Sequence, residues 1–447
     1  HPNIEIRVNS EVKKVDGYVG NFEVTIEKKA TYVDAHKCIG CGVCQEKCPV
    51  KVVPDEFNAA LSTRAAIAIP FPQAVPAIPV IDPDYCRKLK ENKCGVCAKI
   101  CPADAVIFDD EKREEAVNVG AIVVATGYRE MDPAVYTEYG GRTYPDVITG
   151  LQFERLVSST GPTGGKLVRP SDGQEPKTVV FVQCVGSRDE SKAHAYCSGI
   201  CCMYTAKHTM LYKHHVPDGQ AYVSYIDVRA PGKSYDEFVR RAIEEEGVRY
   251  LRGRVSKIRR LTNGQYRIYT EDTLVGRAVH IDTDMVVLAS AVEPQGDAKD
   301  LAQVLGIAYD TDGFYTEAHP KLKPIETASA GVFLAGACQG PKDIPASVQQ
   351  GSASASKVLS LFAKDTLTKS PQIASVDPTA CTGCLTCAYV CHYSAIEEKR
   401  FGKRQVAEVI PGKCQGCGAC VATCKGKAVT LAGCSDDEMY EEIVSCK

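Results

Sequence analysis

The sequence lacks the features that would place the protein in several common functional classes. Its 447 residues carry a net charge of −3, so no basic field indicates a nucleic-acid partner. No apolar run predicts a membrane helix, because the most apolar stretch, residues 65–81, contains four prolines. Tryptophan is absent. The chain also begins without methionine or targeting features, in a strand-like pattern, and we expect it to lack an N-terminal portion.

Cysteine, by contrast, is abundant. There are 23 cysteines, of which 16 fall in four tight runs with the spacing of metal ligands. A cysteine-rich secreted protein held by disulfides is the alternative, but ligand-type runs require thiolates. The spacing therefore predicts a reducing, anoxic cytoplasm as the location.

The first two runs lie between residues 38 and 101. The first is C-x2-C-x2-C-x3-C-P, the spacing of bacterial ferredoxins, and the second has its first gap stretched to seven residues. In such pairs the fourth cysteine of one run binds the cluster of the other. We therefore predict one [4Fe–4S] cluster on Cys38, Cys41, Cys44 and Cys101, and another on Cys86, Cys94, Cys97 and Cys48.

The second pair of runs lies near the C-terminus, where His392 and Lys425 replace the proline that usually follows the fourth cysteine. Crossed ligation predicts one cluster on Cys381, Cys384, Cys387 and Cys424, and another on Cys414, Cys417, Cys420 and Cys391. Structural zinc is the alternative, although zinc sites usually consist of two C-x2-C pairs. Two close clusters at either end of a chain indicate an electron-transfer path.

The segments between the ferredoxin-like runs resemble the two-dinucleotide flavoproteins. A buried strand ends in Thr126-Gly127, residues 280–294 repeat that pattern, and residues 328–357 predict a strand, a glycine-rich turn and a helix. In that family the last segment closes over FAD, and its helix N-terminus faces the flavin. Gly336-Ala337 stands where the family has Gly-Asp, so the ribityl contact of that Asp is lost or replaced. The resemblance implies that FAD is contacted by Thr126, Gly127, Gly336, Ala337, Lys342, Asp343, Ile344, Pro345 and Ser347.

A two-dinucleotide flavoprotein has a glycine-rich phosphate loop at each of its two nucleotide-binding positions, and this sequence has neither loop. The G-x-G-x-x-G that opens an FAD-binding fold is missing, and residues 1–26 look like the strands that follow it. At the second position, strands at 176–182 and 220–230 are predicted to flank a helix at 204–213. There the loop is replaced by thiols, which predict a fifth cluster on Cys184, Cys197, Cys201 and Cys202. A disulfide pair or scattered buried thiols are the alternatives.

A more specific resemblance covers essentially the whole chain. The segments "QCVGSRD", "YCSGICCMYTAKHT", "FPQAVPAIPVID" and "GPKDIP" are similar to the A-type subunit of heterodisulfide reductase from methanogens and related anaerobes. The resemblance implies an α/β fold, with a thioredoxin-reductase-like body of two dinucleotide domains, an inserted and a C-terminal 2[4Fe–4S] ferredoxin domain, one FAD and five clusters in all. It places the fifth cluster beside the flavin, in the position where relatives bind NADPH.

The resemblance also implies a function. It implies flavin-based electron bifurcation in methanogenesis, in which one electron goes to ferredoxin and the other to the CoB–CoM heterodisulfide on partner subunits. Lys207 is the candidate catalytic cation near the flavin, with a surface lysine as the alternative. The implied partners are the other reductase subunits, ferredoxin, and an input subunit from a hydrogenase or formate dehydrogenase, in a dimer of complexes. The alternative function is an electron-transfer scaffold in an aromatic acyl-CoA reductase or a quinone-interacting oxidoreductase.

The remaining cysteines and one histidine have simpler interpretations. We interpret Cys338 as a small buried thiol, His194 as a loop residue, and Cys434 and Cys446 as non-ligands. The predicted domains are residues 1–30, 113–170 and 296–370 for FAD binding, 31–112 and 371–447 for the two ferredoxins, and 171–295 for the converted nucleotide domain.

Overall fold

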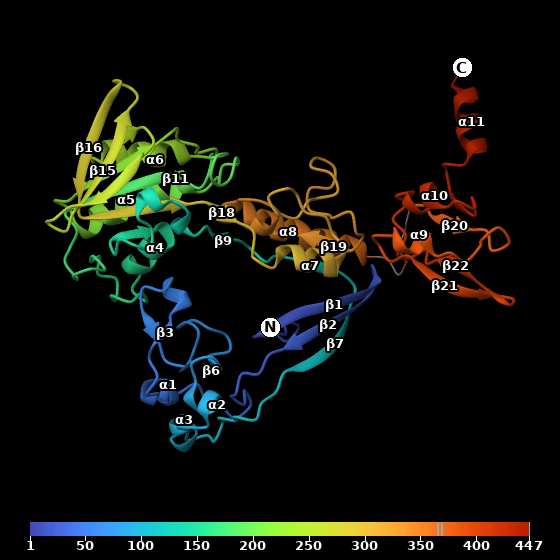
Figure 1. Ribbon diagram of the computed structural model, residues 1–447, viewed down its shortest axis with the longest axis horizontal. Helices are drawn as coiled ribbons and strands as arrows, with labels where there is room; N and C mark the ends of the chain where they lie inside the picture. Colours follow the sequence, from blue (N-terminus) through green and yellow to red (C-terminus); the bar gives the residue numbers. More distant parts are fainter. Residues whose placement is uncertain (364–365, 368–369, 447) are drawn as a thin grey trace. The chain divides into compact units, whose positions relative to one another are not determined.

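The computed structural model describes residues 1–363, 366–367 and 370–446. The chain divides into two compact units, which are described separately (Figure 1). Unit 1 comprises His1–Asn9, Lys29–Arg113 and Arg129–Glu293, and unit 2 comprises Ser10–Lys28, Glu114–Tyr128 and Pro294–Lys447.

Unit 1 is built on a five-stranded parallel sheet. Its order is β10 (Val147–Thr149), β17 (Met285–Ser290), β11 (Thr178–Val185), β12 (Gln220–Tyr225) and β13 (Arg249–Arg252). The central strand β11 is almost wholly apolar, and the side chain of Phe181 is 1% exposed. Burial of such a side chain contributes roughly 1.5–3 kcal/mol, so this run fixes the middle of the sheet.

Helices and a second, antiparallel sheet complete this part of unit 1. The helices are α4 (Gly150–Val157), α5 (Cys201–His215) and α6 (Tyr235–Glu244). The antiparallel strands are β14 (Lys257–Arg260), β15 (Tyr266–Asp272) and β16 (Arg277–Thr283), and β9 (Arg129–Glu130) pairs with β18 (Val292–Glu293). The expected β–α–β order is confirmed, because β11 and β12 pair in parallel and α5 connects them.

The inserted cysteine-rich module of unit 1 has little regular structure. Its helices are α1 (Val43–Lys47), α2 (Arg87–Glu91) and α3 (Val96–Lys99). Its strands have two residues each, β3 (Val53–Pro54), β4 (Thr63–Arg64), β5 (Ile67–Ala68) and β6 (Val80–Ile81). Cysteine side chains themselves take part in its small core.

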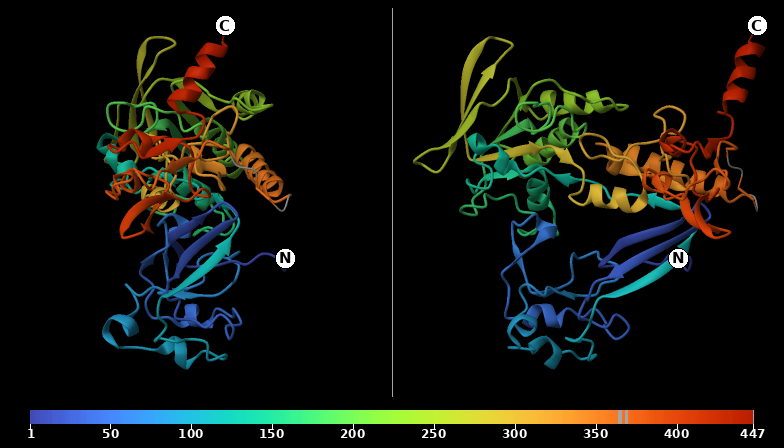
Figure 2. Two further views of the ribbon diagram at one scale, coloured as in Figure 1. Left: turned by 90° about the vertical axis from the view of Figure 1, so that its right-hand side faces the viewer. Right: turned by 45° about the vertical axis from the view of Figure 1, so that its right-hand side comes forward.

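Unit 2 contains an antiparallel ribbon and a pair of parallel strands. The ribbon consists of β1 (Ser10–Tyr18), β2 (Asn21–Lys28) and β7 (Arg113–Val119), which lie side by side in Figure 2. The short strand β8 (Ile122–Val124) pairs in parallel with β19 (Val332–Leu334). The helices are α7 (Ala298–Leu305) and the 18-residue α8 (Ile344–Leu361), so the predicted strand, turn and helix are all present.

The C-terminal cysteine-rich module belongs to unit 2. Strand β20 (Ala374–Val376) pairs with β23 (Val429–Leu431), and β21 (Ile396–Phe401) forms a hairpin with β22 (Arg404–Val409). Its helices are α9 (Thr386–Tyr389), α10 (Ala419–Thr423) and α11 (Asp436–Ser445). In the described part of the chain, no helix combines the length and the apolar character needed to cross a bilayer.

The domain boundaries stay a prediction. The structure places β10, which falls in the segment 113–170, in the parallel sheet of unit 1 together with strands of the segment 171–295. The sheet therefore draws its strands from both segments.

Candidate metal centres

Two cavities in the inserted module are lined by cysteines from both of its runs. One has an empty volume of about 390 Å³, including space open to solvent, and its thiols are Cys38, Cys41, Cys44 and Cys101. The other measures about 350 Å³ on the same basis, and its thiols are Cys48, Cys86, Cys94 and Cys97. Each cavity thus gathers three cysteines of one run and the fourth of the other, which is the crossed arrangement that the spacing predicts.

Backbone hydrogen bonds explain why each cavity takes cysteines from both runs. Asp34, four residues before Cys38, donates its N–H to the carbonyl of Ala105 at 2.7 Å, and the N–H of Ala105 donates to Cys101 Sγ at 3.3 Å. The start of the first run therefore lies beside the end of the second. Backbone N–H groups that point at a sulfur also stabilise a thiolate.

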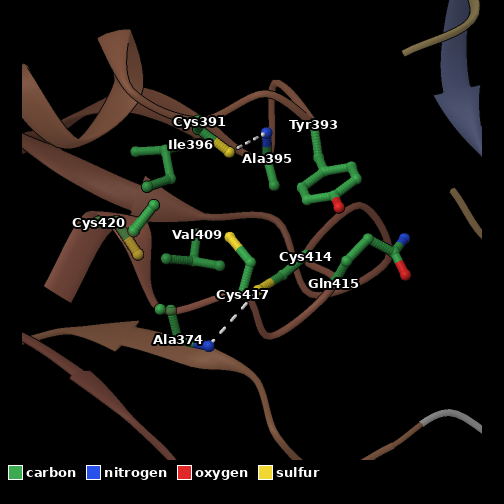
Figure 3. A pocket seen from close by; sticks show the side chains of 12 residues that line it. Ala374, Cys391, Tyr393, Ala395, Ile396, Val409, Cys414, Gln415, Cys417 and Cys420 are labelled. Carbon is green, nitrogen blue, oxygen red and sulfur yellow. Dashed lines mark hydrogen bonds between the residues drawn. The ribbon is translucent and has the colours of Figure 1, made fainter. Parts of the chain in front are cut away.

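The C-terminal module repeats this arrangement. Figure 3 shows the thiols of Cys391, Cys414, Cys417 and Cys420 around one cavity with an empty volume of about 350 Å³, again including open space. Apolar side chains such as Ile396 and Val409 form much of the remaining wall. A cluster in this cavity would be largely shielded from water on that side.

The fourth predicted set, Cys381, Cys384, Cys387 and Cys424, is held by the same backbone pattern. Asp377 donates its N–H to the carbonyl of Ala428 at 2.8 Å, and the N–H of Ala428 donates to Cys424 Sγ at 3.3 Å. Cys381 and Cys387 are buried in the same small core that Cys424 packs against. The pairing of β20 with β23 thus brings the start of one run to the end of the other.

The thiols of the ferredoxin-like runs line cavities and do not converge on the position of a single metal ion. Among the described residues, no three His, Cys, Asp or Glu side chains are placed to hold a single metal ion. Three thiols of one run and the fourth of its partner run around one cavity suit a polynuclear cluster, because ferredoxins hold each [4Fe–4S] cluster with such a set of four thiolates.

Cys184, Cys197, Cys201 and Cys202 meet at the C-terminal edge of the parallel sheet. Cys184 lies near the end of β11 with a φ of 59°, a left-handed conformation that costs about 1–3 kcal/mol for a non-glycine residue. Cys201 and Cys202 are the first two residues of α5, so the helix terminus presents both.

The four thiols lie close enough to shift one another's pKa. Burial, followed by the nearby thiolates of Cys202 and Cys197, raises the pKa of Cys184 to about 11. The thiol of Cys201 donates to Cys202, which raises the pKa of Cys201 and lowers that of Cys202 to about 7. The N–H of Arg229 also donates to Cys202 Sγ at 3.3 Å. Close thiols that shift one another's pKa in this way are a candidate ligand set.

Lys207 lies on α5, five residues beyond Cys202, and its side chain is 43% exposed. Its ammonium forms an ion pair with Glu154 of α4, and His208 Nε2 lies 2.7 Å from the same carboxylate oxygen. His208 and Lys207 hold the pKa of Glu154 at about 2. Burial lowers the pKa of His208, whose Nδ1 has no hydrogen-bond partner. Glu154 and His208 were missed from the sequence: Glu154 belongs to no motif, and His208 lies in the segment "YCSGICCMYTAKHT" but its pairing with Glu154 depends on the packing of α5 against α4.

The residues that resemble an FAD-binding turn come together in unit 2. Leu334 of β19 pairs with Val124 of β8, so Thr126-Gly127 and Gly336-Ala337 both leave the same edge of two parallel strands. Gly127 has a φ of 71° and Gly336 a φ of 80°. The crevice at the carboxyl ends of parallel strands is where α/β folds bind nucleotides.

The helix after this turn begins in the expected way. The side chain of Asp343 caps α8 by accepting from the N–H of Ala346 at 2.8 Å, and Pro345 occupies its first turn. Ile344 is 81% exposed, Ser347 follows in the same turn, and burial lowers the pKa of Lys342. Ala337 has no polar side-chain atom, and the N–H of Gly336 donates instead to Gln350 Oε1 at 2.7 Å. This turn thus fits the flavin end of an FAD site, with Gln350 holding the turn.

The other singled-out residues have ordinary surroundings. Cys338 is 3% exposed, and its thiol lies 3.2 Å from the carbonyl oxygen of Val124. His194 Nε2 contacts Glu293 at 2.9 Å, while Cys434 and Cys446 are exposed.

Comparison with protein families identifies both ferredoxin-like regions. The 4Fe-4S dicluster domain matches residues 373–425, and the 4Fe-4S binding domain matches residues 31–53. The first match spans both C-terminal runs, and the second spans the first run of the inserted module. The fold and these matches define an iron–sulfur protein of α/β type with ferredoxin modules.

Curated relatives extend the match to most of the chain. It is 46% identical over 397 residues to the A-type iron-sulfur subunit of the CoB–CoM heterodisulfide reductase of Methanocaldococcus jannaschii, covering 89% of this chain and 60% of that protein. It is 44% identical to the A-type subunit of the H2:CoB-CoM heterodisulfide,ferredoxin reductase of Methanothermobacter thermautotrophicus, with 89% and 59% covered. A protein of Archaeoglobus profundus that is named as similar to the A-type heterodisulfide reductase subunit is 43% identical, with 90% and 63% covered.

These relatives confirm the resemblance that the sequence motifs indicated. Over the part of those proteins that it spans, the chain is similar to A-type heterodisulfide reductase subunits. It spans about 60% of the length of these curated relatives. A solved thioredoxin reductase of T. acidophilum aligns at 14% identity with a TM-score of 0.35, over 56% of this chain and 68% of that one, too low a score to support an inference.

Proposed function

We propose that the chain is the FAD- and [4Fe–4S]-containing electron-transfer subunit of a heterodisulfide reductase complex. The observation that best supports this is the gathering of cysteines from paired runs around three cavities in the crossed arrangement of ferredoxins. A cluster on the fourth set and one on the Cys184 group, which consists of Cys184, Cys197, Cys201 and Cys202, would bring the number of clusters to five. Relatives that are named as parts of heterodisulfide reductases support the assignment of the complex.

The protein's contribution at the ferredoxin modules is to hold thiolates in place and exclude water. The N–H groups of Ala105, Ala395 and Ala428 each donate to a cysteine sulfur at 3.3 Å. Hydrogen bonds to the sulfurs and burial are the means by which a protein sets a cluster's reduction potential. A bound [4Fe–4S] cluster supplies one-electron transfer.

The chain's contribution to FAD is a turn at the edge of two parallel strands, with the helix α8 behind it. We propose that Thr126, Gly127, Gly336 and Ala337 line the flavin end, with Lys342 and the first turn of α8 beside them. When bound, FAD supplies the conversion between two-electron and one-electron transfer on which bifurcation rests. The glycine loop for its pyrophosphate is not among residues 1–447.

Lys207 is proposed as the cation near the flavin. Its ammonium is held by Glu154, whose carboxylate also contacts His208, so its position is set by two helices. A cation placed in this way stabilises negative charge that develops nearby. The proposed partners are the other reductase subunits, ferredoxin, and an input subunit from a hydrogenase or formate dehydrogenase, in a dimer of complexes in a reducing cytoplasm.

The experiment is anaerobic cofactor analysis of the native complex, combined with a coupled assay. Reduction of ferredoxin that depends strictly on the heterodisulfide supports bifurcation. Clusters without FAD, or electron transfer that does not depend on the heterodisulfide, would favour an electron-transfer scaffold instead. The relative from Archaeoglobus profundus, which is named only as similar to the reductase, is the observation that keeps this second function in view.

A further inference from the structure

The stretched gap between Cys86 and Cys94 is filled by a strongly basic segment. Residues 87–93 read RKLKENK, with four cationic side chains and one acidic one. Lys99 follows on α3. The exposed cations Arg87, Lys90, Lys93 and Lys99 form the cationic face of the module.

The positive charge of the inserted module is concentrated in this segment. Residues 31–112 contain ten Lys and Arg and eleven Asp and Glu. The segment 87–99 holds five of the cations but only one of the acids, so the remainder of the module has a net charge of −5. A module with one positive end and an acidic body orients a charged partner as it approaches.

This face adjoins one particular cysteine set. Arg87 and Lys88 line the cavity of Cys48, Cys86, Cys94 and Cys97, and Cys94 itself is exposed. Helix α2 carries Arg87, Lys88 and Lys90, Lys99 ends α3, and Lys93 lies in the segment between the two helices (Figure 1). A protein docked here would lie beside this cluster, where electron transfer is fast.

Two of the five cations have side-chain partners within the segment, and Lys93 pairs with Glu91 at 3.3 Å. Lys88 is turned back, donating to Asn92 Oδ1 at 2.6 Å, and its ammonium lies 5.8 Å from the centre of the Phe108 ring. Asn92 ends α2 in a left-handed conformation with a φ of 54°. Tyr85 is 39% exposed and Val96 37%, which gives the face an apolar component. A few apolar side chains within a ring of charge are typical of weak, transient interfaces.

We propose that the cationic face docks a small acidic electron-carrier protein beside the cluster of Cys48, Cys86, Cys94 and Cys97. This inference rests on the proposed function and assigns it a docking surface. One electron lost by the cluster is gained by the carrier, or the reverse, and no bond or proton moves. Charge complementarity selects an acidic carrier, since a basic one would be repelled by the face.

The test replaces Lys90, Lys93 and Lys99 with glutamine in the native complex. The matched control replaces Lys37, Lys47 and Lys51, which are exposed on the same module and change its net charge equally. The probe is an acidic 2[4Fe–4S] ferredoxin. Its affinity and its second-order electron-transfer rate are measured at several salt concentrations, after the iron content of each variant is shown to be unchanged.

The wild-type rate is expected to fall steeply with salt. The Lys90, Lys93 and Lys99 variant should lose roughly tenfold in rate at low salt and show a flatter salt dependence. The control should change by less than about threefold. Equal loss in both variants, or full activity in both, would overturn the proposal, as would protection of this face by another subunit in the complex.

Two features keep the test decisive. If the triple variant loses iron, Lys90→Gln alone is used, because Lys90 is exposed on α2 and is not among the residues that line the cavity. Carrier docking is measured without the heterodisulfide, from chemically reduced ferredoxin to the oxidised complex, so it can fail while bifurcation holds. It can also succeed while bifurcation fails.

Discussion

Cys391 and Cys414 line the same cavity, although they belong to different cysteine runs. Cys391 ends the run that starts at Cys381, and Cys414 starts the next one. A module that held each run around its own cluster would separate them. Their meeting shows that the C-terminal module interleaves its two halves, as the inserted module does with Cys48 and Cys86.

The first prediction concerns this crossing. Cys391→Ser should remove the cluster of Cys414, Cys417 and Cys420 and leave the cluster that follows Cys381 in place, because Cys391 lines the cavity of the former three cysteines. Iron should fall by about four atoms. Cys434→Ser is the control, since Cys434 is exposed and outside the runs. Loss of the signal that Cys381→Ser also removes would instead show uncrossed ligation.

The second prediction separates the Cys184 group from an isolated buried thiol. Cys184→Ala should remove one cluster, about four irons, because Cys184 interacts with Cys197, Cys201 and Cys202. Cys338→Ala is the control. Cys338 is as deeply buried as Cys184, but its thiol contacts backbone carbonyls and no cysteine that we predict to be a ligand, so the iron content should not change. Unchanged iron in both variants would mean that the group is not a cluster site.

The third prediction concerns the partners of Lys207. Glu154→Gln should speed reductive methylation of the Lys207 amine several-fold, since the ion pair that restrains it is lost. Because the pKa of Glu154 is held at about 2, the carboxylate stays ionised above pH 5, and its stabilising effect is lost only as the pH falls toward 2. The ratio of variant to wild-type rates should therefore be constant from about pH 6 to about pH 9. Peptide mass spectrometry measures it.

His208 provides a second variant of the same site. His208→Gln keeps a donor in reach of Glu154, whereas His208→Phe removes it, so only the phenylalanine variant should raise Lys207 reactivity. Equal reactivity in both would show that His208 packs in this core without positioning the carboxylate.

The fourth prediction is a pH dependence of stability in unit 1. Burial raises the pKa of Glu130 to about 7. The folded state therefore favours the protonated form, and stability falls as the pH rises from about 4.5 through 7. Glu130→Gln, which cannot ionise, should be more stable than wild type by on the order of 2 kcal/mol at about pH 8. The advantage should shrink as the pH is lowered toward about 5.5 in thermal unfolding, and a constant difference would contradict the assignment.

Much of the fold could be predicted from the sequence because its signals are local. Spacing alone indicated the crossed cysteine sets, and the strand, turn and helix at residues 328–357 follow from an apolar run, a Gly-rich turn and the Asp343 cap. Glu154 and His208 could not be predicted, because they meet between two helices that are far apart in the sequence. Gln350 is similar, since its contact with Gly336 depends on the packing of α8 against the turn.

The place of β10 in the parallel sheet could not be predicted from the sequence, for a different reason. Val147–Thr149 is too short to indicate its sheet, and only its pairing with β17 places it beside the nucleotide-type core. Short strands obtain their register from their neighbours, so their own residues contain little information about it.

The most direct test of the account is anaerobic determination of iron, sulfide and FAD in the native complex, assigned to this chain. Five [4Fe–4S] clusters predict about 20 irons and as many sulfides, together with one FAD. About 16 irons would contradict the cluster at Cys184, Cys197, Cys201 and Cys202, and the absence of FAD would contradict the electron-splitting function.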